Sequence, residues 1–121
     1  MKVLKVLMLS VLVAGLLSSF AFAAGNPEKG KAMFNDPKAF GGQKACSSCH
    51  PDGRGLEKAA AEKEWTTPAG KTKTLEEAIN LCIVNANKGK ALAVKSEQMA
   101  DMVAFIKSLG KKMEKKAAPG Y

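Results

Sequence analysis

The sequence predicts a small all-α domain of three to five helices, and three observations support this class. Apolar residues recur at helical spacing in the second half of the chain, and these runs follow residues that cap helices. No segment shows the alternation of apolar and polar residues that is typical of strands. A chain of 121 residues accommodates one domain, and no internal repeat divides it.

Residues 1–23 are predicted to be a secretory signal peptide. Lys2 and Lys5 form a basic start, residues 3–20 are almost wholly apolar, and Ala21-Phe22-Ala23 supplies an A-x-A cleavage site. The alternative is an uncleaved membrane anchor, because the apolar run approaches the length that spans a bilayer. Cleavage would leave no membrane span, and the mature protein would be periplasmic or secreted.

Residues 24–110 are predicted to form the domain. Asn26 and Pro27 suit the cap and the first position of a helix that runs to about residue 34. Residues 57–65 form a weaker candidate helix, and residues 66–73 form a loop. Thr74 begins the clearest helix, because it starts a T-x-x-E capping box. Its single apolar stripe, which places Cys82 on the buried face, consists of Leu75, Ala78, Ile79, Cys82 and Ile83.

The last helix is predicted to follow Ser96 and to end at Gly110. Its apolar face contains Met99, Met102, Val103 and Ile106. Residues 111–121 are basic and then rich in alanine, proline and glycine. We expect them to form a basic, flexible C-terminal tail.

Residues 46–50 read C-S-S-C-H, the pattern of a c-type haem attachment site. Cys46 and Cys49 have the spacing to form thioethers with the two vinyl groups of one haem edge, and His50 would bind the iron. The sequence therefore predicts one covalently attached haem c around which the helices pack. A disulfide or a redox-active dithiol is the alternative, but neither needs the histidine, and no βαβ pattern surrounds the motif.

The net charge of the full chain is +8, and it is +6 without the two lysines of the signal peptide. The lysines are spread along the sequence rather than clustered with aromatic residues, which argues against nucleic-acid binding. A redox partner protein with an acidic surface, or an anionic substrate, would suit this charge. A generally solvated basic surface explains it equally well.

The order of motifs resembles the class I c-type cytochromes. Residues 30–34 read G-K-A-M-F, the haem motif follows, and residues 101–109 read D-M-V-A-F-I-K-S-L. The resemblance implies a small cytochrome c fold whose first and last helices cross, with Gly30 and Phe34 meeting Val103 and Phe105 or Ile106. Class I members usually take the sixth iron ligand from a methionine in the loop before the last helix. That loop, residues 88–95, has none, so Met99 is the alternative distal ligand.

Residues 65–92 resemble a narrower group through W-x-x-P, T-L-E-E-A-I-N-L-C and N-K-G-K-A-L. They are similar to the diheme subunit of the thiosulfate-oxidising complex and to thiosulfate dehydrogenase. This resemblance implies that Cys82 binds the haem iron opposite His50. The diheme subunit carries a catalytic arginine at the position of Ala78, and those enzymes have more than one haem motif.

The leading hypothesis is an exported monohaem electron carrier, an electron-transfer protein with no catalytic residue assigned. Cys82 is then an odd thiol in an oxidising compartment, which iron coordination would protect; a small buried residue is the alternative. The second hypothesis is a redox enzyme for thiosulfate or tetrathionate, or its haem subunit bound to a protein partner. The third is a five-coordinate gas-binding cytochrome.

Overall fold

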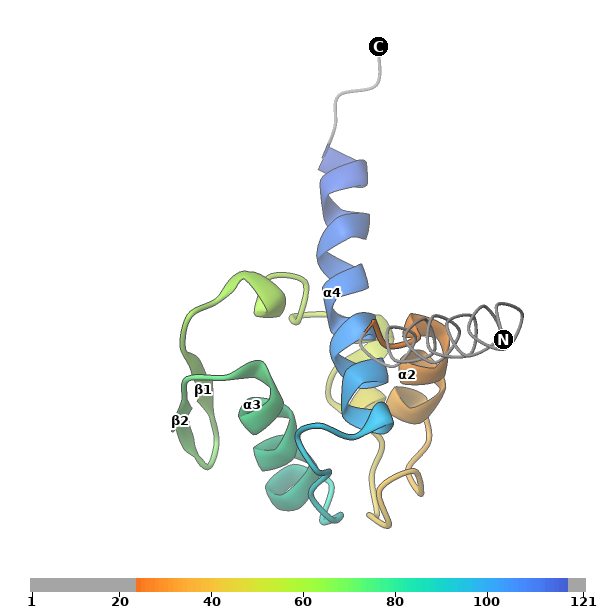
Figure 1. The fold of residues 1–121 in the computed structure, drawn as a ribbon, viewed down its shortest axis with the longest axis vertical. Helices are drawn as coiled ribbons and strands as arrows, with labels where there is room; N and C mark the ends of the chain where they lie inside the picture. The colour runs from red at the N-terminus through yellow and green to blue at the C-terminus, as the bar shows by residue number, and fades with distance from the viewer. Residues whose placement is uncertain (1–23, 118–121) are drawn as a thin grey trace, which may run out of the picture.

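The computed structural model describes residues 24–117. The predicted signal peptide and the last four residues lie outside this range. Within it, three α-helices, four short helical turns and one two-stranded sheet follow one another along the chain (Figure 1). No helix of the described range is both long and apolar enough to cross a bilayer.

Helix α2 (Pro27–Asn35) packs across helix α4 (Glu97–Ala117). The Asn26 side chain caps α2 by accepting hydrogen bonds from the backbone N–H groups of the first turn, as its position predicts. The crossing is close because Gly30 has no side chain: a Cβ there would collide with the carbonyl oxygen of Asp101. The rings of Phe34 and Phe105 pack against each other beside it in a tilted arrangement, with centroids 5.0 Å apart and planes at 57°. The predicted contact between the first and last helices is confirmed for Gly30 and Phe34 with Phe105.

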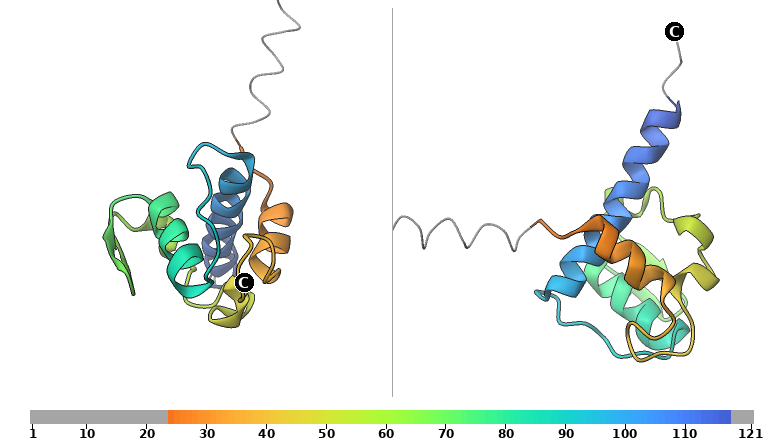
Figure 2. Two further views of the ribbon diagram at one scale, coloured as in Figure 1. Left: turned by 90° about the horizontal axis from the view of Figure 1, so that it is seen from below. Right: turned by 90° about the vertical axis from the view of Figure 1, so that its right-hand side faces the viewer.

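Helix α3 (Leu75–Leu81) lies on the other side of α4 from α2 (Figures 1 and 2). Thr74 caps it by accepting a hydrogen bond from the Glu77 N–H at 3.2 Å, as the capping box predicts. The helix then widens into a π-helical turn (Cys82–Ala86), in which the Asn87 N–H donates to the Cys82 carbonyl. The core lies between the three helices and contains Phe34, Phe40, Leu75, Ile79, Ile83, Met99, Met102, Phe105, Ile106 and Leu109.

The prediction of an all-α domain is wrong, because a β-hairpin lies where we expected a loop. Strands β1 (Trp65–Thr67) and β2 (Gly70–Thr72) pair in antiparallel register around a two-residue turn. Thr67 closes the turn, since its hydroxyl donates to the Gly70 carbonyl at 3.0 Å. Gly70 has a φ of +133°, which favours glycine. Strands of three residues are too short to show an alternating pattern, so the sequence signal was absent.

Two helix boundaries also differ from the predictions. The candidate helix at residues 57–65 is reduced to a 3₁₀ turn (Ala59–Ala61), and α4 does not end at Gly110 but continues to Ala117. Gly110 instead allows the Glu57 carbonyl to approach the helix, because a Cβ there would lie 2.9 Å from that oxygen. The start after Ser96 is confirmed, since the Ser96 hydroxyl accepts a hydrogen bond from the Met99 N–H at 3.2 Å. The division into a domain and a tail at residue 110 stays a prediction.

Candidate functional site

The C-S-S-C-H motif forms a tight turn between α2 and the rest of the domain. Residues Cys46–Ser48 adopt a 3₁₀ turn, and both the Cys49 and the His50 N–H groups donate to the Cys46 carbonyl. Cys46 is half-buried and Cys49 is exposed. Together with Cys82 they are free thiols in the described part of the chain. The turn therefore holds two unpaired thiols and an imidazole in a short, hydrogen-bonded segment.

The His50 ring is fixed by the backbone that follows it. Its Nδ1 atom lies 3.0 Å from the carbonyl oxygen of Arg54. A carbonyl only accepts hydrogen bonds, so Nδ1 carries the proton and Nε2 keeps a lone pair that is free to bind a metal. The loop reaches this position because Gly53, with a φ of +75°, lets the chain turn against Leu109 of α4. Such a bond orients metal-binding histidines in general.

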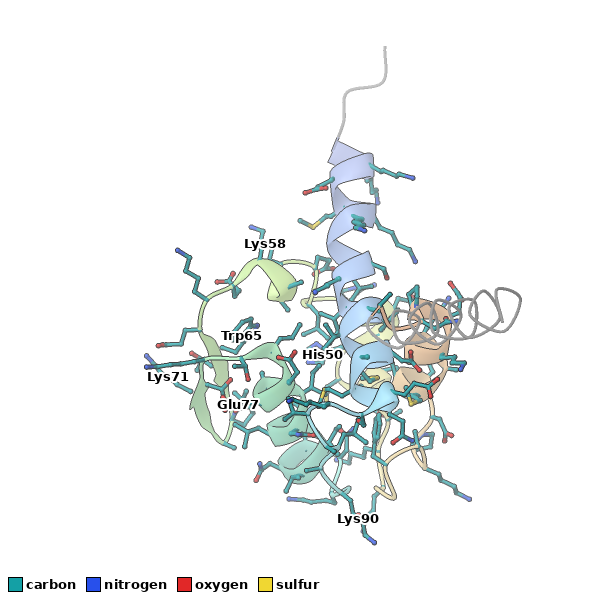
Figure 3. All side chains as sticks on the ribbon, viewed as in Figure 1. His50, Lys58, Trp65, Lys71, Glu77 and Lys90 are labelled. Atoms are coloured by element: carbon teal, nitrogen blue, oxygen red, sulfur yellow. The ribbon has the colours of Figure 1, made fainter. Side chains whose placement is uncertain are left out.

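A cavity of about 590 Å³ lies against this histidine. Figure 3 shows His50 between α3 and α4, and these two helices supply two walls of the cavity. Cofactor sites in proteins usually have about 300–1,000 Å³ and a mostly apolar lining with a few convergent polar groups. The apolar walls come from Phe34, Leu56, Leu75, Ile79, Met102 and Ile106, and the polar edge comes from Lys58, Glu62, Glu64, Thr66 and Thr67. The size and the lining fit a large, mainly apolar group that bears a metal for His50.

Cys82 lines the same cavity as Cys46 and His50. It lies where α3 widens into the π-helical turn, and its N–H donates to the carbonyls of both Ala78 and Ile79. Burial raises the pKa of the Cys82 thiol, and the nearby Cys46 and Cys49 sulfur atoms raise it further. The thiol is therefore uncharged unless a cation in the cavity stabilises the thiolate. The structure brings together Cys46, His50 and Cys82.

Met99, the alternative distal ligand, does not line this cavity. Its side chain is only 1% exposed and packs in the core near the start of α4. The loop before α4 is held against α3, because both the oxygen and the nitrogen of the Asn80 side chain form 2.8 Å hydrogen bonds with the Leu92 backbone. Met99 is therefore a core residue in this structure, and the Asn80 hydrogen bonds hold the loop in place against α3.

Sequence reasoning missed Asn87, which joins the segments that carry two of the cysteines. Its side-chain nitrogen donates to the Cys46 sulfur at 3.4 Å, and its backbone N–H donates to the Cys82 carbonyl at 3.1 Å. Its carbonyl accepts a third hydrogen bond, from the Gln43 N–H at 2.8 Å. Asn87 is 5% exposed and lies 41 residues from Cys46, so no local sequence pattern predicts this contact.

Comparison with known proteins identifies the family. The family model of the SoxA/TsdA cytochrome c domain matches residues 29–114. The chain belongs to this family. It is a c-type haem cytochrome that resembles the sulfur-oxidation cytochromes, as the motifs at residues 65–92 predicted, and its haem iron serves electron transfer. No curated protein and no solved structure matches the chain.

Proposed function

We propose that this SoxA/TsdA-type domain is an exported carrier of single electrons with one haem c. Cys46 and Cys49 would hold the haem through thioethers, and His50 would bind its iron. Cys82 would be the ligand on the opposite face. The observation that carries this proposal is that Cys46, His50 and Cys82 line one apolar cavity of cofactor size.

Each of these residues has a distinct task in the proposed mechanism. When bound, haem supplies a one-electron iron couple, and the protein sets its potential through axial ligands and burial. The Arg54 carbonyl holds the His50 proton on Nδ1 and so keeps Nε2 available. The apolar walls exclude water, and Asn87 fixes the Cys46 sulfur relative to the Cys82 segment. A thiolate from Cys82 would favour ferric iron and a low reduction potential.

The test is a mass and a spectrum of protein that was matured by a host with c-type haem machinery. The mass should exceed that of residues 24–121 by one haem, and acid–acetone extraction should leave the haem on the polypeptide. The oxidised protein should show the near-infrared and EPR signals of low-spin iron bound by histidine and thiolate. Extractable haem would exclude the thioethers, and an N-terminus at residue 1 would contradict export by signal cleavage.

A sulfur-anion redox enzyme, or its haem subunit, is the second proposal, and family membership favours it. Ala78 lines the cavity at the position where the diheme subunit has its catalytic arginine, and the cation of the lining is Lys58. A methyl group does not bind an anion, so among the residues that line this cavity Lys58 is the cation available for that purpose. Turnover of thiosulfate or tetrathionate by the purified holoprotein would support the enzyme.

Rapid CO binding to the reduced protein without ligand displacement would support the gas-binding alternative instead.

A further inference from the structure

Helix α4 continues well beyond the domain body. The Glu57 carbonyl approaches α4 closely at Gly110. From Lys111 to Lys116 every side chain is exposed. Figure 1 and the right-hand view of Figure 2 show this end of α4 projecting from the rest of the structure. We call residues 107–116 the lysine arm.

The lysine arm carries most of the net charge of the mature protein. It contains five lysines and one glutamate, a net charge of +4, whereas residues 24–121 together carry +6. Among the described residues, the ion pairs are Lys29–Glu97 and Lys71–Glu64, and neither involves the arm. The helix dipole favours cations only in the last turn, which accounts for Lys115 and Lys116 but not for the others. Like charges four residues apart destabilise a helix, so the arm is not optimised for its own stability.

The arm starts at the edge of the cavity. Ile106 lines the cavity, and Lys107 follows it directly. Glu57, which touches Gly110, is followed by Lys58 and Ala59, both of which line the cavity. Figure 3 shows Lys58 on the side toward which α4 projects. A molecule bound to the arm would therefore lie next to this edge of the cavity.

We infer that the lysine arm docks an acidic redox partner protein beside the haem site. The inference rests on the proposed function. Carboxylates of the partner would face the lysines of the arm. Met113, which is 42% exposed and lies among these lysines, would supply an apolar contact with the partner. One electron then passes between the two proteins, so that one is oxidised and the other reduced, with no transfer of a bond or a proton. A protein is favoured over a membrane because an interfacial helix needs a broad apolar face, and the exposed arm has one large apolar residue.

A carboxylate-terminated monolayer on gold serves as the acidic surface in the test. The holoprotein is adsorbed at low ionic strength, and its electron-transfer rate to the electrode is measured by voltammetry. In the arm variant, Lys111, Lys112, Lys115 and Lys116 are changed to Gln. The control variant changes four exposed lysines elsewhere to Gln, and these are Lys31, Lys38, Lys73 and Lys95.

We expect the rate of the arm variant to fall about tenfold or more, and that of the control to change less than twofold, because steering depends on where the charge lies. Lys→Arg changes at the four arm positions should keep the wild-type rate, and circular dichroism should show unchanged helix content in every variant. Equal losses in the arm and control variants would overturn the inference, because net charge alone would then explain binding.

Two further measurements separate the possible failures. Exchange with dissolved hexaammineruthenium tests the electron carrier itself, since this small ion needs no docking arm. If that exchange is absent, the proposed function fails; if it is present and the arm variant behaves like the control, only the docking inference fails. Arm-dependent binding to phosphatidylglycerol vesicles at 0.15 M salt would assign the arm to a membrane and overturn the protein partner.

Discussion

At the scale of single residues, the site depends on which atoms are left free. The Arg54 carbonyl occupies the Nδ1 proton of His50, so the ring can bind a metal only through Nε2. The Trp65 indole N–H donates to the Ala59 carbonyl at 2.8 Å and is not free to bind a ligand. Cys82 is different, because its thiol lines the cavity and no hydrogen bond to its sulfur accounts for it within the described residues.

Replacing Cys82 should change the ligand set of the haem iron, and with it the spectrum and the reduction potential. In Cys82→Met a neutral thioether replaces the thiolate, so ferrous iron is favoured and the potential should rise, within the range of about 0.8 V that axial ligands set. Cys82→Ala should give a high-spin or water-ligated spectrum. The matched control is Val84→Ala, in the same turn and 42% exposed, which should keep the wild-type spectrum and potential. Wild-type signals in both Cys82 variants would make Cys82 a packing residue.

Asn87 should matter for both stability and spectrum. Asn87→Ala removes the donor to the Cys46 sulfur, and the loss of a buried hydrogen bond and of packing should cost about 1–3 kcal/mol of unfolding free energy. We also expect shifted axial-ligand signals, because Asn87 links the Cys46 and Cys82 segments. Asn85→Ala is the control: it lies two residues away and is exposed, so it should cost less than about 0.5 kcal/mol. Equal effects of the two variants, measured by denaturant unfolding, would contradict this role.

At the scale of elements, the contact between α2 and α4 closes the fold. Asn26 not only caps α2 but also donates its backbone N–H to the Asp101 carboxylate of α4 at 2.6 Å, and Asp101 is only 4% exposed. The end of one helix is thereby hydrogen-bonded to the face of the other. This contact positions Phe34, Met102 and Ile106, all of which line the cavity.

Gly30→Ala should therefore separate these helices. The added Cβ would meet the Asp101 carbonyl and the Phe105 Cβ, so either the helices move apart or the backbone distorts. Overpacking of this kind costs about 1–3 kcal/mol, although alanine favours a helix more than glycine does. Thermal unfolding of the holoprotein measures the effect. Lys31→Ala, one residue along on the exposed side, is the control, and an equally stable Gly30→Ala protein would show that the crossing tolerates a side chain.

At the scale of the whole molecule, the cavity implies that the haem is part of the fold. The walls of the cavity are core residues of all three helices. Without a bound group these apolar walls would face water, and each Å² of apolar surface left unburied forfeits about 25 cal/mol of stabilisation. The domain is therefore expected to depend on its cofactor for a unique structure.

A variant that cannot attach haem tests this dependence. Cys46→Ala/Cys49→Ala, expressed without haem, should lack a cooperative thermal transition and should lose its near-ultraviolet circular dichroism. The wild-type holoprotein, purified in the same way, is the control for both measurements. An apoprotein that unfolds cooperatively near the transition temperature of the holoprotein would mean that the three helices form a sufficient core by themselves.

Local patterns were enough to predict part of this protein. The Asn26 and Thr74 caps and the helical stripe through Cys82 were evident in the sequence. Caps and helical periodicity depend on residues within one or two turns of each other. The same locality explains the match of motifs to the SoxA/TsdA family. Whether Cys82 binds iron and whether residues 1–23 direct export stay predictions.

Only the tertiary structure decided the remaining features. The hairpin at Trp65–Thr72 is too short to carry a pattern. Helix α4 continues through Gly110, whose missing side chain leaves room for the Glu57 carbonyl. The sequence also left Cys82 and Met99 as rival ligands, because the resemblance implied Cys82 and residues 88–95 contain no methionine. Packing placed Met99 in the core and Cys82 at the cavity with Cys46, to which Asn87 connects it. Such contacts join residues tens of positions apart, and they depend on how whole helices pack rather than on any neighbouring residue.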